Sequence, residues 1–338
     1  MKTRIKRIVD WSGSRIAPFQ KAEGPPPQEL GAFFLWALRG AIPILWIAAA
    51  FSAFAGMMEV LTALILGRVI DAAVDSGPVA FFAQHWLLLV GFVLFFALLR
   101  PVAFGLSAAA NAIVVQPNVN PLVLSRLHRW TLGQAVTFFD DDFAGRIAQK
   151  QMQTARAITE VTSELINVVA FALASLIGSA LLLTTINIWV SLLLVVWLVA
   201  YFSLITWFLP HIRVRSKDRA GARAMVSGQV VDTITNIKTV KLFAHGAHEE
   251  TEALGAMETF RTKALAFGKM AASFRFALMG LAGVLPVLLI GSTLLLWQAG
   301  HASAGDIAAA GAIAIRIAQM TGWVSFTLMA LYANVGEV

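Results

Sequence analysis

The 338-residue sequence has no cysteine and little charge. Without cysteine there are no disulfide bonds and no thiolate metal sites. Charged residues make up 13% of the chain and hydrophobic residues 58%, whereas roughly a quarter of a soluble domain is charged. This shortage of charge, together with repeated long apolar runs, indicates that lipid surrounds most of the chain.

Six apolar stretches are long enough to cross a bilayer, which takes about 20 helical residues. They lie near residues 41–66, 82–110, 168–186, 190–210, 276–297 and 307–330. The runs are continuous rather than alternating, and buried backbone amides need internal partners, so helices are expected and barrel strands are not. The predicted fold class is an all-α membrane protein with six transmembrane helices.

Basic residues predict the orientation. Of the 26 Lys and Arg residues, seven precede the first span, five lie between spans two and three, and eleven lie between spans four and five. The three opposite loops, expected around residues 75–81, 187–189 and 299–306, contain none. Because basic loops stay on the cytoplasmic side, both termini and both long connections are predicted to be cytoplasmic. The net charge of +7 follows this membrane pattern, so we expect no nucleic-acid partner.

The two long connections are predicted to form helical hairpins. Residues 149–162 and 219–243 contain no proline and mix charged with apolar positions at helical spacing. Such hairpins either present their tips to a partner or act as spacers. At the N-terminus, residues 1–28 are expected to form a cytoplasmic basic arm, and residues 29–39 a helix along the inner membrane interface.

Each hairpin has a distinctive tip. Residues 137–147 read TFFDDDFAGRI, in which Phe138 and Phe139 form an apolar knob that needs a partner to cover it, and Gly145 permits a turn. Residues 232–244 of the second hairpin read DTITNIKTVKLFA. Weaker patterns occur at 67–71 (GRVID), at the expected outer end of span one, and at 299–306 (AGHASAGD), where Gly305 and Asp306 can cap a helix.

These motifs, in this order on six spans, resemble the transmembrane domain of ATP-binding-cassette (ABC) exporters of the multidrug and lipid-flippase type. The resemblance covers residues 29–338 and implies a dimer, homomeric or heteromeric, around a substrate cavity that opens alternately inward and outward. It implies a small-molecule or lipid substrate and a bacterial inner membrane. It also implies that the hairpin tips couple to nucleotide-binding domains through Thr137, Phe138, Phe139, Asp140, Gly145, Arg146, Ile237, Lys238, Val240, Lys241 and Phe243.

The sequence departs from that family in one respect. It contains no phosphate loop of the form G-x-x-x-x-G-K-[ST]. We therefore expect no cofactor on this chain. ATP and Mg²⁺ are expected on a nucleotide-binding domain that is either missing from this sequence or supplied by another polypeptide. Two other interpretations stay open: a permease subunit served by a separate ATPase chain, and a membrane scaffold that does not transport.

Ionisable residues inside the spans are candidates for the cavity. Glu59 and Arg316 fall near mid-membrane, where charged groups are rare and face a cavity or a partner. Either they line the cavity, or Glu59 forms a structural ion pair with Arg316 or Arg100. Asn111 and Gln319 face the cavity or bond between helices. His245, His248 and Glu249 are interpreted as a solvated helix end, and 140–142 as capping or partner-facing carboxylates, so no metal site is assigned.

Overall fold

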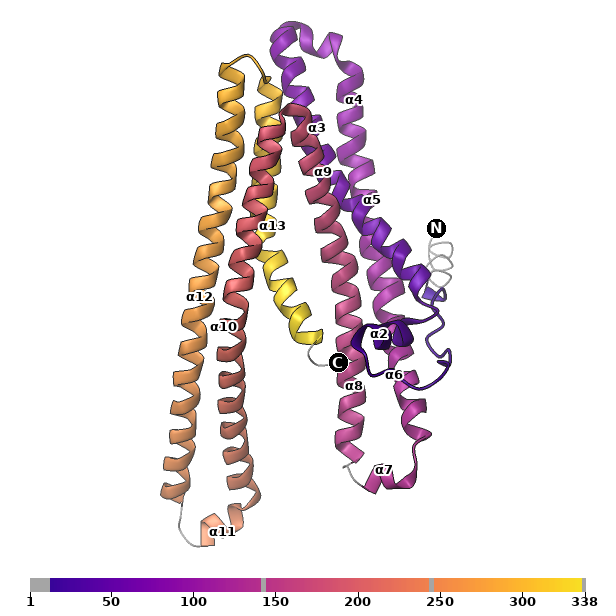
Figure 1. The fold of residues 1–338 in the computed structure, drawn as a ribbon, viewed down its shortest axis with the longest axis vertical. Helices are drawn as coiled ribbons and strands as arrows, with labels where there is room; N and C mark the ends of the chain where they lie inside the picture. Colours follow the sequence, from indigo (N-terminus) through magenta and orange to yellow (C-terminus); the bar gives the residue numbers. More distant parts are fainter. Residues whose placement is uncertain (1–12, 141–143, 243–245, 336–338) are drawn as a thin grey trace. The chain divides into compact units, whose positions relative to one another are not determined.

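A computed structural model describes residues 13–140, 144–242 and 246–335, and these residues form helices and no strands. The elements are drawn in Figure 1. Their bounds are α2 Leu30–Leu38, α3 Ile42–Gln84, α4 Trp86–Leu94, η1 Phe95–Leu99, α5 Arg100–Ala109, η2 Ala110–Val115, α6 Gln116–Leu132, α7 Val136–Asp140, α8 Ala144–Glu164, η3 Leu165–Ala170, α9 Phe171–Ile186, α10 Ile188–Thr235, α11 Ile237–Leu242, α12 Gly246–Gln298 and α13 Ala304–Val335.

Six helical segments in the described part of the chain are long and apolar enough to cross a membrane. Each of the six predicted spans falls largely within one of them, so the predicted fold class is confirmed. The structure corrects the end of the first span. Residues 75–81, expected as a loop, lie within the bounds of α3, but the backbone leaves helical geometry at Gly77 (φ 67°), before Pro78, so two helical stretches meet at a kink inside the expected loop. Glycine tolerates this positive φ, so the chain bends at Gly77 between two helical stretches of α3.

The second membrane segment is one long helix with two wider π-helical turns, η1 and η2. Pro101 follows η1 and Pro117 follows η2. A helical proline clashes with the carbonyl four residues earlier, here that of Ala97 or Ile113, and a π turn relieves the clash. α6 itself is helical from Gln116 to Leu132, with Pro121 inside it.

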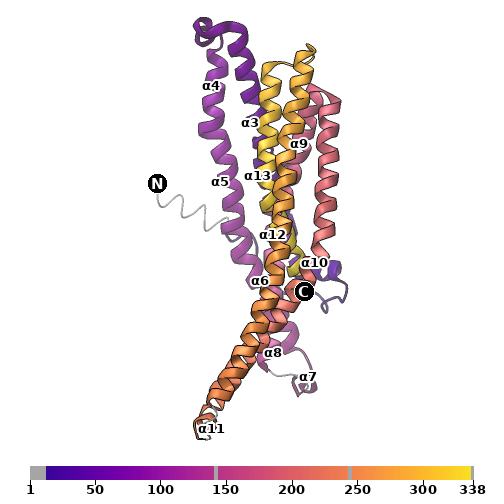
Figure 2. The same ribbon diagram turned by 90° about the vertical axis from the view of Figure 1, so that its left-hand side faces the viewer.

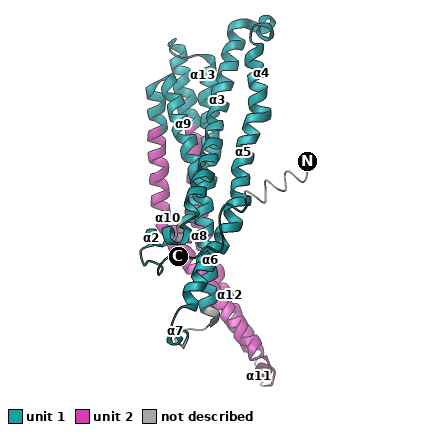
Figure 3. Ribbon diagram, turned by 90° about the vertical axis from the view of Figure 1, so that its right-hand side faces the viewer, with its two compact units in different colours: residues 1–194, 286–338 teal, residues 195–285 magenta. Residues whose placement is uncertain are grey.

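The chain forms two compact units: residues 1–194 with 286–338, and residues 195–285 (Figure 3). In the first unit, α3 packs against α5, α9 and α13. A separate apolar core in the same unit joins α2 to α6 and α8 through buried residues that include Trp36, Leu122, Val123 and Ile158. This core anchors the first hairpin, in which α6 and α8 run side by side to the tip formed by α7 (Figure 1).

The second unit consists of two antiparallel helices, the 195–235 part of α10 and the 246–285 part of α12, with α11 between them (Figures 1 and 2). Contacts recur along its whole length. The indole Nε1 of Trp197 donates to the Leu281 carbonyl at 2.8 Å, and the rings of Phe208 and Phe274 lie 5.1 Å apart. Farther along, Lys263 lies 3.5 Å from Asp218. The second hairpin is therefore held together from end to end.

The part of α3 around Asp71 meets the start of α13. Ser303 and Asp306 bond reciprocally, Ser303 N to Asp306 Oδ2 at 2.8 Å and Asp306 N to Ser303 Oγ at 3.0 Å, which is a capping box. Asp71 accepts hydrogen bonds from Ser303 Oγ (2.8 Å) and Gly305 N (2.6 Å). The two weaker sequence patterns, 67–71 and 299–306, thus lie against each other, with Asp306 acting as part of the predicted cap.

Candidate functional site

The tip of the first hairpin presents aromatic side chains. α6 ends at Leu132, and the short helix α7 carries Thr137, Phe138 and Phe139, all exposed. The two phenyl rings meet edge to face, 5.3 Å apart, and remain 43% and 41% exposed. Asp140 ends α7, and Gly145 and Arg146 lie in the first turn of α8, but their side chains fall outside the described residues. The exposed phenyl pair is an apolar surface that a partner can cover.

The tip of the second hairpin is the short helix α11. α10 ends at Thr235, and Asn236 forms a turn that is held by a 2.9 Å hydrogen bond from its Nδ2 to Asp232 Oδ1. On α11, Ile237, Lys238 and Lys241 are exposed and Val240 is half-buried. Phe243 lies outside the described residues. The described coupling residues therefore lie on two short helices, α7 and α11, each at a hairpin tip, except Gly145 and Arg146, which lie at the start of α8.

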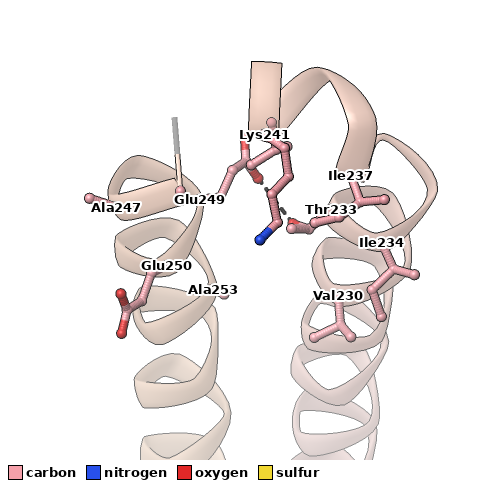
Figure 4. A pocket seen from close by; sticks show the side chains of 11 residues that line it. Val230, Thr233, Ile234, Ile237, Lys241, Ala247, Glu249, Glu250 and Ala253 are labelled. Carbon is pink, nitrogen blue, oxygen red and sulfur yellow. Dashed lines mark hydrogen bonds between the residues drawn. The ribbon is translucent and has the colours of Figure 1, made fainter. Parts of the chain in front are cut away.

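A cavity of about 560 Å³ lies inside the second tip, between the end of α10, α11 and the start of α12 (Figure 4). Val230, Ile234 and Ile237 line one side, and Ala247, Glu250 and Ala253 line the other. Thr233 donates a 3.0 Å hydrogen bond to Glu249 Oε2 across it. This bond joins the two helices just before α11, so the tip is braced by side chains rather than by the turn alone.

Three ionisable residues from three helices meet in the first unit. Glu59 of α3 is buried, with 6% of its side chain exposed. Its Oε1 accepts a hydrogen bond from Arg100 Nη2 at 3.0 Å, and its Oε2 lies 3.1 Å from Arg316 Nε. The sequence allowed either pair, and the structure forms both. One carboxylate between two guanidinium groups leaves a net positive charge on this triad.

Aromatic rings surround the triad. The guanidinium carbon of Arg100 lies 5.3 Å from the centre of the Phe104 ring, and that of Arg316 lies 6.0 Å from the centre of the Phe171 ring. Arg316 Nε is close to Glu59, but it is not aligned as a hydrogen bond, and Arg100 Nε is likewise buried without an acceptor among the described residues. The triad therefore keeps unused donors beside its ion pairs.

The two candidate amides behave differently. Asn111 lies in η2, and its Oδ1 is buried without a hydrogen-bond donor in the described part of the chain. Gln319 is exposed on α13, three residues after Arg316. The assignment of Asn111 and Gln319 to the substrate cavity stays a prediction.

The structure shows one arrangement that sequence reasoning missed. Residues 13–20 lie along α6, whose side chains bond to their backbone carbonyls: Asn118 to Gly13, Ser125 to Pro18 and Arg129 to Phe19. Arg126, buried on the same helix, donates to the carbonyls of Trp36 and Ala37 at 2.7 and 3.0 Å, which caps the end of α2. In the sequence, Arg126 and Arg129 appear only as basic residues of a loop predicted to be cytoplasmic. No signal distinguished them from the other basic residues of that loop.

Six apolar helices with two helical hairpins, each ending in a short exposed helix, define an all-helical membrane domain. Residues 45–320 match the family of ABC transporter transmembrane regions. The match covers most of the sequence, and the chain therefore belongs to the ABC transporter transmembrane family.

A curated protein and a solved structure are also similar to the chain. The chain is 29% identical over 341 aligned residues to a Haemophilus influenzae protein described as an uncharacterized ABC transporter ATP-binding protein. The alignment covers 99% of this chain and 54% of that protein, so the chain spans about half the length of the relative. The structure of a bacterial Atm1-family ABC exporter with ATP bound has the same fold, with a TM-score of 0.67 and 14% identity, over 89% of this chain and 51% of the other.

Proposed function

We propose that this integral membrane domain moves a hydrophobic or amphipathic substrate from the cytoplasm outward by alternating access, driven by ATP hydrolysis on nucleotide-binding domains. The observation that carries the proposal is the pair of hairpin tips. α7 and α11 are short helices that expose Phe138, Phe139 and Ile237 to solvent. Exposed apolar side chains at the tip of a hairpin are suited to binding a partner protein. Side-chain contacts hold the hairpin together, so it can transmit the movement of that partner.

The second unit supports a dimer. Beyond the predicted spans its two helices expose many large apolar side chains, among them Val214, Met225, Val231, Leu254 and Leu265. Lipid does not reach that far from the membrane if the hairpin is cytoplasmic, so protein must cover these residues. A second transmembrane domain, identical or related, provides that cover, as the resemblance to exporters implies.

The nucleotide-binding domains would hold ATP and Mg²⁺. In this scheme the two nucleotide-binding domains close when they bind ATP. The hairpins transmit that movement through α7 and α11. The substrate cavity then changes the side of the membrane to which it opens. The proposed location is the bacterial inner membrane, with both hairpins and both termini in the cytoplasm, since the basic residues gather in those segments.

The test uses the chain assembled with its nucleotide-binding domain in proteoliposomes. Phe138→Ala should weaken domain association about 30-fold, as removal of a buried aromatic anchor does, and should uncouple substrate transport from ATPase activity. Phe19→Ala is the matched control, because Phe19 is 66% exposed but lies on the N-terminal arm.

Two results would contradict the proposal. Equal effects of Phe138→Ala and Phe19→Ala would show that α7 has no special role in binding the nucleotide-binding domain. An ATPase that binds the tips while no substrate crosses the membrane would indicate a scaffold instead of an exporter.

A further inference from the structure

A second cavity, of about 510 Å³, lies in the first unit between the N-terminal arm, α2 and α6. Lys21 and Gly24 of the arm, Trp36 of α2, and Arg126, Arg129 and Trp130 of α6 line it. Its volume is within the range of about 300–1,000 Å³ that is typical of small-ligand sites. Nothing in the transport scheme uses this cavity.

The cavity is strongly positive. Its lining has three basic side chains, and no carboxylate of the described chain is among the lining residues. The nearby Glu23 is engaged elsewhere, 2.8 Å from Arg39 Nη1. The positive charges of Arg39 and Arg129 both repel that of Arg126. Three like charges gathered without a counter-charge favour an anion in the space that they share.

The three basic residues that line the cavity make different contacts. Arg126 is buried, and its donors go to the carbonyls of Gln20, Trp36, Ala37 and Arg39, so it holds the walls together. Arg129 donates Nη1 to the Phe19 carbonyl at 2.8 Å, and the rest of its exposed guanidinium fork stays available. Lys21 is exposed, with all three ammonium donors available for a ligand. An arginine fork beside an ammonium suits the oxygens of a phosphate.

The surroundings of the cavity are those of a membrane interface. α2 immediately precedes the first spanning helix and exposes Leu35, which is 63% accessible and can contact the apolar part of a membrane interface. Trp36 and Trp130 border the cavity, and tryptophan favours the headgroup zone. If the hairpins are cytoplasmic, as the proposed function assumes, the cavity faces the leaflet that carries anionic lipid.

We propose that this cavity binds a phosphate group, carried by the headgroup of an anionic phospholipid or by a soluble phosphate ester. Lys21 and Arg129 contact the phosphate oxygens, and Arg126 holds the arm and α2 in place around them. Bound phosphate would fasten the N-terminal arm to α6, the first helix of the first hairpin.

The test measures binding to the purified full chain in detergent by native mass spectrometry, with phosphatidylglycerol, phosphatidylcholine and glycerol 3-phosphate as separate probes. The test variant is Lys21→Gln with Arg129→Gln. The control is Arg215→Gln with Lys217→Gln, which removes the same charge from exposed positions on α10. Each basic residue near anionic lipid contributes about five-fold to affinity, so the test variant should bind about 30-fold more weakly than the unaltered chain.

The three probes identify the source of the phosphate. Preferential binding of phosphatidylglycerol assigns the site to lipid, and preferential binding of glycerol 3-phosphate assigns it to a soluble ester. Lys21→Gln alone, at an exposed side chain, should give about a five-fold loss without affecting folding. The proposal is overturned if the test variant binds like the unaltered chain, if the control loses as much, or if neither phosphatidylglycerol nor glycerol 3-phosphate binds more tightly than phosphatidylcholine.

Discussion

At the scale of single residues, charge balance inside the bundle depends on Glu59. Its carboxylate lies 3.0 Å from Arg100 and 3.1 Å from Arg316, which come from α5 and α13. Each arginine side chain is about one-third exposed, whereas that of Glu59 is almost fully buried. The carboxylate therefore joins three helices at a point where an uncompensated positive charge would be costly.

Glu59→Gln should destabilise the domain by about 3 kcal/mol, because two arginines then lose their only shared counter-charge in the described structure. Thermal unfolding in detergent measures this. Glu258→Gln removes an exposed pair with Arg261 and should change stability by less than about 1 kcal/mol. Equal unfolding temperatures for the two variants would show that the triad is not a structural support.

A second prediction separates the two interpretations of Arg316. If the triad lines the substrate cavity, Arg316→Ala in the reconstituted transporter should change the stimulation of ATPase activity by substrate, since a positive charge with an unused buried donor is lost. Assays of ATPase activity with and without substrate measure this. A variant that only expresses or folds poorly, with unchanged stimulation per folded molecule, would assign Arg316 to structure.

At the scale of helices, close approach of α3 and α13 depends on glycine. A Cβ at Gly67 would lie 2.7 Å from the Gly305 carbonyl oxygen, so a side chain there must push the helices apart. Small residues at such crossings let helix backbones touch, which is a main source of helix association in lipid. The same crossing carries the Asp71 bonds to Ser303 and Gly305.

Gly67→Ala should therefore destabilise the domain by about 1–3 kcal/mol, despite the better helix propensity of alanine. Gly105→Ala is the matched control, because its Cβ would meet no atom within 4 Å, and it should be neutral or stabilising by up to about 1 kcal/mol. Chemical denaturation of both variants measures the difference. A Gly67 variant as stable as the Gly105 variant would mean that the helices separate without cost.

The sequence predicts the helices better than it predicts how they meet. Span number and type follow from apolar length, which composition alone reveals. Asp75, Gly77 and Pro78 are typical of a loop, and α3 does kink at Gly77, but its helical turns on both sides of that kink were not predicted. The double ion pair of Glu59 was foreseen only as alternatives, because one sequence gives depth along each helix but not the face that side chains share. The capping of α2 by Arg126 depends on tertiary contact alone.

At the scale of the whole molecule, the proposed direction of transport depends on which side holds the hairpins. Lysine and arginine are concentrated in the segments that form α6 to α8 and α10 to α12, and the opposite connections have none. The positive-inside rule predicts that the hairpins are cytoplasmic.

Single cysteines test this directly, since the natural chain has none. His301→Cys, in the exposed connection between α12 and α13, should react with a membrane-impermeant maleimide on intact cells. Lys217→Cys, exposed on α10, should react only after lysis. Mass shifts of the purified variants measure the labelling. The reverse pattern would place the hairpins outside and would rule out their coupling to a cytoplasmic ATPase.

The central claim is that both hairpin tips contact an ATP-hydrolysing partner. The most direct measurement is site-specific crosslinking from Phe138→Cys on α7 and Ile237→Cys on α11 in the assembled complex, with the crosslinked partner identified by mass spectrometry. Crosslinks from both positions to an ABC nucleotide-binding domain, with yields that change when ATP binds, are the predicted result. Crosslinks from neither position to such a domain would contradict the account.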